Sequence, residues 1–178
     1  MAAIFPSAAE RHGVHIYRTD DEIVGSVAGA LEAAIGAGDA ILVVAGRDHR
    51  VAVEAALRTA GVSPDPGAYL ALDAEGTLDS LLVEGELDSA RFRSVIGSVV
   101  GRFAAGRPGV TIYGEMVGLL WSRGQVMSAM RLEGFWNELG AEVAFSLLCG
   151  YRADESMDQW DVDDVHRCHS HVVPSPMR

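Results

Sequence analysis

The run from Ala40 to Ala45, AILVVA, is apolar at every position and is bounded by Asp39 and Gly46. A strand that shows no alternation of apolar and polar residues is typical of a parallel sheet with helices on both faces. Strands that alternate with helices along a chain are joined by right-handed crossovers. The run therefore predicts an α/β protein, a three-layer sandwich with a mainly parallel central sheet.

The rest of the chain supplies the alternating elements that such a sheet needs. Thr19 and Glu22 have the spacing of a capping box and open a helix. Hydrophobic spacing predicts further strands at 14–17, 68–72, 110–113 and 143–149, and helices at 20–35, 50–60, 89–105, 125–139 and 161–169. The acid-rich segment 73–88 predicts either a short helix or a loop, the expected mobile cover over a sheet edge.

The length of 178 residues is typical of one domain. We expect this domain over residues 12–172, with a flexible leader at 1–11 and a disordered tail at 173–178. Residues 1–10 lack the basic and apolar regions of a secretory signal, and no apolar run reaches the roughly 18 residues of a membrane span. Two cysteines far apart do not make a disulfide framework. We therefore expect a soluble cytoplasmic protein.

The charge of the chain excludes several classes of function. The formal net charge of −11 argues against direct nucleic-acid binding, which needs clustered cations. All 14 basic residues are arginine, so there is no Walker-type phosphate lysine and no lysine for a Schiff base. The first turn, Arg18 to Glu22, has no glycine and carries three acids that would repel a triphosphate. No nucleophile elbow or dinucleotide fingerprint is present either, and we expect a protein without catalytic activity.

The stretch from Val110 to Tyr151 contains the first candidates for a site. Glu115 follows a predicted strand, at the sheet edge where α/β proteins bind ligands, although it could also simply satisfy a helix end. Glu133 lies at the edge of an apolar helix face, where a buried carboxylate needs a partner, and we expect an arginine. Cys149 is either a reactive thiol or a buried wall residue. Core packing competes with a ligand pocket as the role of Tyr17, Tyr113, Trp121, Trp136 and Tyr151.

A group of possible metal ligands lies near the C-terminus. His166, Cys168, His169 and His171 offer imidazole and thiolate, which suit zinc, copper or haem iron. They fall within one short segment, however, whereas structural zinc sites usually draw ligand pairs from separate segments. A composite site that also uses His12 and His15 would draw its ligands from separate segments. We expect no metal or cofactor, and the alternative is a zinc or haem redox sensor that uses these C-terminal residues.

The order of several short motifs resembles the methanogen/methylotroph sensory domain family, MEDS, over residues 12–172. The matching residues are His15 and Tyr17, Gly38-Asp39-Ala40, Gly114-Glu115-Met116, Leu132-Glu133 with Trp136, Leu147 to Tyr151, and His169. The resemblance implies a degenerate RecA/KaiC-like fold without a functional P-loop, and a sensory role toward small hydrocarbon derivatives. Many members are fused to signalling or DNA-binding domains, which implies a role in signal transduction or transcription regulation.

The 178 residues leave no room for an output domain beside the sensory one. We therefore expect either that the signal passes through a partner protein or a homo-oligomer, or that the chain is one part of a longer protein. The resemblance and the predicted strand ends together nominate the ligand-binding residues: His15, Tyr17, Glu115, Met116, Glu133, Trp136, Cys149, Tyr151 and His169.

Overall fold

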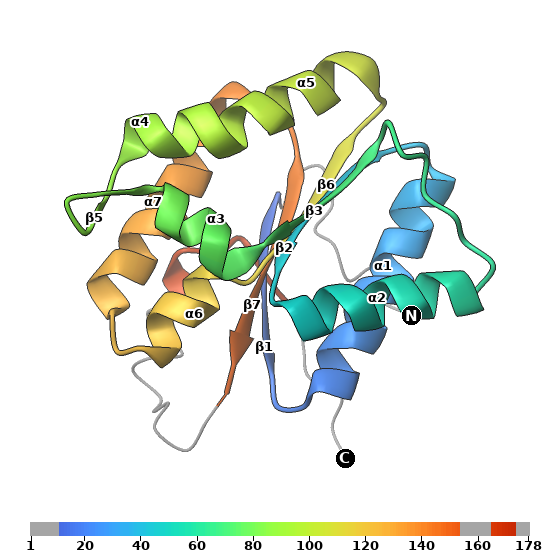
Figure 1. The fold of residues 1–178 in the computed structure, drawn as a ribbon, viewed down its shortest axis with the longest axis horizontal. Coiled ribbons are helices and arrows are strands. Elements are labelled where there is room, and N and C mark those ends of the chain that lie inside the picture. Colours follow the sequence, from blue (N-terminus) through green and yellow to red (C-terminus); the bar gives the residue numbers. More distant parts are fainter. Residues whose placement is uncertain (1–10, 154–164, 174–178) are drawn as a thin grey trace.

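A computed structural model describes residues 11–153 and 165–173 and shows a six-stranded parallel sheet (Figure 1). The strand order is β3-β2-β6-β7-β1-β8, and each neighbouring pair is parallel. The strands are β1 (His12–Tyr17), β2 (Ala40–Ala45), β3 (Tyr69–Asp73), β6 (Val110–Gly114), β7 (Ser146–Arg152) and β8 (His171–Val173). A separate two-stranded hairpin consists of β4 (Leu82–Val83) and β5 (Glu86–Leu87).

Helices cover both faces of the sheet, which confirms the predicted three-layer α/β sandwich (Figure 1). One face is covered by α1 (Asp20–Gly36) and α2 (Arg47–Thr59). The other is covered by α3 (Ala74–Ser80), α4 (Ser89–Phe92), the π-helical segment η1 (Arg93–Gly97), α5 (Ser98–Gly106), α6 (Met116–Ser122) and α7 (Val126–Glu142). Each face has its own hydrophobic core, so strand residues that alternate along the chain enter different cores.

The strand predicted from the apolar run Ala40–Ala45 is completely buried. All six residues of β2 are buried, and β2 lies between β3 and β6. The predicted capping box is present as well: the Thr19 side chain accepts a hydrogen bond from the Glu22 backbone N–H at 3.3 Å. These two features direct the chain out of β1, along α1 and back into the middle of the sheet.

Segment 73–88, which the sequence left between helix and loop, contains both α3 and the β4–β5 hairpin. Asp73 caps α3 by accepting a hydrogen bond from the Gly76 N–H at 3.0 Å. Leu81 and Leu87 are 0% and 3% exposed and belong to the core under α7. The segment is therefore anchored by buried leucines, whereas the sequence analysis expected a mobile cover.

Several boundaries differ from the predictions. Helix α6 was not predicted, and β7 begins at Ser146 because α7 continues to Glu142. Strand β8 was also missed; it pairs with β1, and Ser170 fixes the junction by donating to the His12 carbonyl at 2.9 Å. The predicted leader, tail and final helix lie largely outside the described residues, although 165–167 are helical. Within the described ranges, none of the helices combines the length and apolar character that crossing a membrane requires.

Candidate functional site

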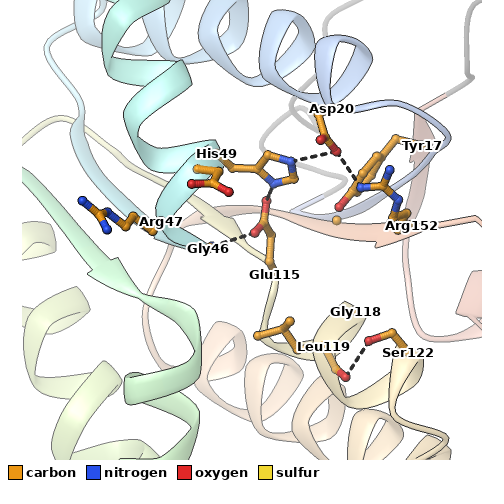
Figure 2. Close-up of a pocket in the computed structure, with 12 residues that line it drawn as sticks. Tyr17, Asp20, Gly46, Arg47, His49, Glu115, Gly118, Leu119, Ser122 and Arg152 are labelled. Atoms are coloured by element: carbon orange, nitrogen blue, oxygen red, sulfur yellow. Dashed lines mark hydrogen bonds and ion pairs between the residues drawn. The ribbon is translucent and has the colours of Figure 1, made fainter.

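A cavity of about 350 Å³ opens at the carboxyl ends of β1, β2, β6 and β7 (Figure 2). We call it the crevice; its lining includes Tyr17, Asp20, His49, Glu115, Leu119 and Arg152. Strand order explains its position, because β2, β6, β7 and β1 are consecutive neighbours whose ends meet along one edge. This is the edge at which open α/β sheets bind ligands.

Glu115 is the most firmly held group of the crevice. It follows β6 directly and is 7% exposed. Its Oε2 accepts from the Gly46 backbone N–H at 2.8 Å, and its Oε1 accepts from the Tyr113 hydroxyl at 2.7 Å. The His49 Nδ1 lies 2.5 Å from the same Oε1 (Figure 2). Three donors thus fix an otherwise costly buried carboxylate in one orientation.

His49 links Glu115 to the rim of the crevice. Its Nδ1 contacts Glu115 and its Nε2 lies 3.3 Å from Asp20 Oδ1. An imidazole between two carboxylates donates from both nitrogens only when it is protonated. The hydrogen bond to Glu115 raises the pKa of His49, against the opposing effect of burial, and Asp20 raises it further. Both contacts therefore favour the cationic form of the ring.

The row of charges ends at the strand β7. Arg152 Nη1 lies 2.6 Å from Asp20 Oδ1, and the hydrogen bond to His49, followed by that to Arg152, lowers the pKa of Asp20. Negative and positive groups alternate along Glu115, His49, Asp20 and Arg152 (Figure 2). Glu115 is paired with His49, and Asp20 is paired with Arg152, so each carboxylate has a basic partner. Asp20 and Arg152 are exposed, and a ligand can reach them most easily.

The pKa shift of His49 predicts a pH dependence of stability. Because the folded-state pKa is raised above the usual 6.5, the contribution of His49 to the free energy of unfolding is fully present below pH 6.5 and is lost as the pH rises through the raised value. In urea denaturation, the stability advantage of the wild type over His49→Gln should shrink as the pH is increased from below 6.5 to above the raised pKa. An advantage that is constant over this range would contradict the ion pair with Glu115.

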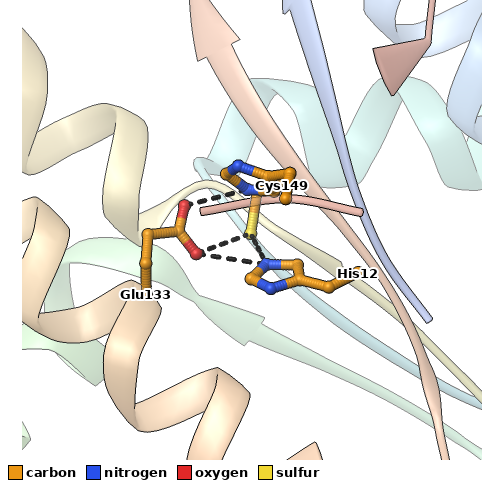
Figure 3. A group of neighbouring side chains, drawn as sticks. His12, Glu133 and Cys149 are labelled. Atoms are coloured by element: carbon orange, nitrogen blue, oxygen red, sulfur yellow. Dashed lines mark hydrogen bonds and ion pairs between the residues drawn. The ribbon is translucent and has the colours of Figure 1, made fainter. Parts of the chain in front are cut away.

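A second cluster of polar side chains lies between α7 and the face of the sheet that α7 covers. Glu133 is 0% exposed in the middle of α7 and reaches His12 and Cys149 on the adjacent strands β1 and β7 (Figure 3). Its Oε2 lies 3.1 Å from His12 Nε2 and 3.6 Å from Cys149 Sγ. Its Oε1 accepts from the Tyr151 hydroxyl at 2.6 Å and lies 3.1 Å from His169 Nε2. The partners found are histidines and a tyrosine, where the sequence analysis expected an arginine.

Burial and the contacts of Glu133 together shift the pKa values in this cluster. It raises the pKa of the Cys149 thiol and of the Tyr151 hydroxyl, and the negative charge of Glu133 raises both further. Burial alone would also raise the pKa of Glu133, but the contacts with His12 and His169 outweigh it and lower that pKa. The result is an ionised carboxylate beside a protonated thiol and a protonated phenol. A hollow of about 470 Å³, lined by His12, His169 and Cys168 among others, adjoins the cluster.

The structure divides the nominated residues between these two places. Tyr17 and Glu115 line the crevice, whereas Glu133, Cys149, Tyr151 and His169 meet in the second cluster. Trp136 packs edge-on against Phe92 in the core and also lines the hollow. The reason is the alternation of strand residues: Cys149 and Tyr151 face α7, while Gly150 between them lines the crevice.

Two nominated residues lie outside both groups. His15 is fully buried, with its Nε2 3.3 Å from Glu22 Oε1, and burial lowers its pKa. Met116 is 1% exposed in the core beneath α7. Of the C-terminal group His166, Cys168, His169 and His171, only His169 belongs to the second cluster.

Three residues that line the crevice were not among the candidates nominated from the sequence: Asp20, His49 and Arg152. His49 could have been found from its position, because it stands in the first turn after the most apolar strand, at the strand's carboxyl end. His12 entered only as one half of a composite site, and its contact with Glu133 depends on a pairing of distant segments.

Comparison with known proteins bears on this geometry. The model of the family described as MEDS, "MEthanogen/methylotroph, DcmR Sensory domain", matches residues 11–170. No curated protein and no solved structure matches the chain, and the likeness to KaiC-type ATPases therefore stays a prediction. Since the family model covers most of the chain, the protein belongs to the MEDS family and is a sensory domain.

Proposed function

We propose that this sensory domain is non-catalytic and binds a small organic ligand in the crevice beside Glu115. The observation that carries the proposal is the buried Glu115 carboxylate, fixed by Gly46, Tyr113 and His49 at the edge of a cavity. Ligand pockets are concave and combine apolar walls with a few fixed polar groups. The crevice has this composition, and it lies where α/β sheets bind ligands.

The size and lining of the crevice favour a small ligand with one polar end. A volume of about 350 Å³ lies at the lower end of the range for ligand pockets. Tyr17 and Leu119 offer apolar surface, while His49 and Arg152 offer hydrogen-bond donors. A hydrocarbon derivative that carries a hydroxyl, carbonyl or carboxylate group fits this arrangement. Its polar group would contact the cations, and its apolar part would lie against the tyrosine and the leucine.

Nucleotide binding is disfavoured by the start of α1. Thr19 and Glu22 satisfy the backbone N–H groups there, since Thr19 accepts from the Glu22 N–H and Glu22 accepts from the Arg18 N–H. The first turn carries Asp20, Asp21 and Glu22. These acids already complement the helix dipole and would repel a triphosphate. The proposal is therefore a receptor site and not an ATPase site.

The charge row suggests how a ligand would be sensed. Asp20 begins α1, His49 lies in α2 and Arg152 ends β7, so their contacts connect three elements at the mouth of the crevice. A ligand that binds His49 or Arg152 competes with Asp20 and shifts the balance between arrangements of α1 and α2. Such a shift is limited by the difference in ligand affinity between the two arrangements. We propose that a partner protein or a second copy of the chain reads this change.

Thermal-shift screening of small alcohols, carboxylic acids and halocarbons tests the site. A ligand at about 100 times its dissociation constant adds about 2.7 kcal/mol to the free energy of unfolding, or roughly 5–10 °C in Tm for a domain of this size. We expect Glu115→Ala to abolish the rise, because the variant loses the group that orients His49. Glu138→Ala is the matched control, because Glu138 is 61% exposed on α7, and it should keep the rise.

Two outcomes would contradict the proposal. One is that no compound of these classes stabilises the wild type. The other is that Glu115→Ala retains the full rise in Tm for every compound that stabilises the wild type.

A further inference from the structure

Four potential metal ligands from separate parts of the chain meet in the second cluster. The side-chain ligand atoms of His12, Glu133, Cys149 and His169 all lie within 4.8 Å of one another. They come from β1, from α7, from β7 and from the turn before β8. We propose that these residues bind one divalent transition-metal ion of the zinc class. The site is distinct from the crevice and does not depend on the function proposed for it.

The hydrogen bonds of the two histidines determine which nitrogen faces the cluster. His169 Nδ1 lies 2.7 Å from the Val165 carbonyl oxygen, which can only accept, so Nδ1 carries a proton. His12 Nδ1 lies 2.9 Å from Asn137 Oδ1, and the Asn137 amide nitrogen is turned toward the Cys168 carbonyl at 3.4 Å. In the neutral form of each ring, Nε2 therefore carries a lone pair.

Both of these lone pairs face the Glu133 carboxylate. The two Nε2 atoms lie 3.1 Å from its oxygens. The His169 side chain is 0% exposed, and its Nε2 has no hydrogen-bond partner of suitable geometry among the described residues. Buried polar atoms are nearly always satisfied, and an exception needs an explanation. A cation in the centre of the cluster is that explanation, because it would accept lone pairs from both rings and from the carboxylate.

The charges of the cluster favour a single divalent ion. Without a metal, the buried Glu133 carboxylate lies against two imidazoles whose ring centroids are 4.4 Å apart, and a buried charge needs an opposite charge to balance it. With a divalent ion, the Glu133 carboxylate and a Cys149 thiolate balance its two charges, and both histidines stay neutral. The proton of the thiol is released to solvent on binding.

The three distances among His12 Nε2, Glu133 Oε2 and Cys149 Sγ are close to those of a tetrahedral site. Metal–ligand bonds of about 2.0–2.3 Å produce tetrahedron edges of about 3.3–3.8 Å. The observed contacts of His12 Nε2 are 3.1 Å to Glu133 Oε2 and 3.3 Å to Cys149 Sγ, and this sulfur lies 3.6 Å from the same oxygen. Sulfur and nitrogen ligands select zinc-class ions over magnesium or calcium.

The surroundings of the ligands also match those of metal sites. Histidine ligands usually donate their other N–H to a carbonyl or carboxylate, and ligating carboxylates are themselves hydrogen-bonded. Here Val165 and Asn137 accept from the two rings, and the Tyr151 hydroxyl donates to Glu133 at 2.6 Å. The adjoining hollow of about 470 Å³ is lined by His12 and His169 and offers a route for the ion.

The test uses the full chain purified without a histidine tag, stripped with a chelator and titrated with Zn²⁺. We expect one Zn²⁺ per chain, and a Co²⁺-substituted form with a thiolate-to-cobalt charge-transfer band. Cys149→Ser and His169→Gln should lower the Zn²⁺ affinity at least about 100-fold and abolish the sulfur band in the first case. Cys168→Ser and His171→Gln are the matched controls, and both should keep the affinity and the band.

X-ray absorption of the wild-type zinc form decides the question if a variant fails to fold. One sulfur and three nitrogen or oxygen neighbours are expected. A chain that binds no Zn²⁺ after stripping, or a zinc shell without sulfur, would overturn the proposal. The same conclusion follows if Zn²⁺ is lost in Cys168→Ser and His171→Gln and retained in Cys149→Ser, since the ion would then be held by Cys168 and His171.

Discussion

Replacing Glu133 by alanine should lower the free energy of unfolding by about 3–5 kcal/mol in the presence of a chelator. Glu133 is completely buried and contacts His12, His169 and Tyr151. Its removal leaves these groups without their common partner and opens a gap in the core, and both losses are costly. Urea denaturation at neutral pH measures the difference.

A control substitution on the same helix distinguishes the loss of the cluster contacts from a change in helix propensity. Glu138 is 61% exposed on α7, and Glu138→Ala should change the free energy of unfolding by less than about 0.5 kcal/mol. If Glu133→Ala costs as little as Glu138→Ala, the contacts around Glu133 do not support the fold.

The second large effect concerns the contact between α6 and β7. A Cβ atom at Gly118 would lie 2.4 Å from the Gly150 carbonyl oxygen, which belongs to the backbone and cannot rotate away. Gly118→Ala should therefore push α6 off the sheet and lower the free energy of unfolding by about 1–3 kcal/mol. Both glycines line the crevice, so the same substitution should weaken ligand binding.

Gly134 on α7 provides the matched comparison. A Cβ there meets no described atom within 4 Å, and alanine is the better helix former by about 0.5–1 kcal/mol. Gly134→Ala should accordingly stabilise the protein. Opposite signs for the two substitutions support the close approach of α6 to β7, and a Gly118→Ala variant as stable as the wild type would refute it.

The layered fold was predictable because its signals are local. An unbroken apolar run predicted the buried strand β2, and the capping box predicted the start of α1; both are confirmed. Strand β8 has only three residues, too few for a period to appear. Helix α6 follows β6 after a single residue, Glu115, and its short, wholly apolar start carries no helical period either.

The position of the crevice was predictable from the sequence, but the division of the nominated residues between the crevice and the second cluster was not. The rule that ligands bind at the carboxyl ends of parallel strands located Glu115 correctly at the edge of a cavity. Whether Cys149 faces that cavity depends on which side of β7 it occupies, and a strand buried on both faces has no polar alternation to reveal the side. His12 meets Glu133 where β1 pairs with β7, and His169 meets it where β8 pairs with β1. Both are contacts between segments far apart in the chain.

The most direct test of the ligand site is an NMR titration of the ¹⁵N-labelled protein with a compound that raises its Tm. The Gly46 amide donates to Glu115 Oε2 at 2.8 Å, so its signal reports on that carboxylate, and Leu119 and Gly150 report on the walls of the crevice. We expect the largest shift changes at these three residues, and small ones at Gly140 and Ala141, which line the hollow beside the second cluster. Changes concentrated at Gly140 and Ala141, with Gly46 unmoved, would contradict the proposed ligand site.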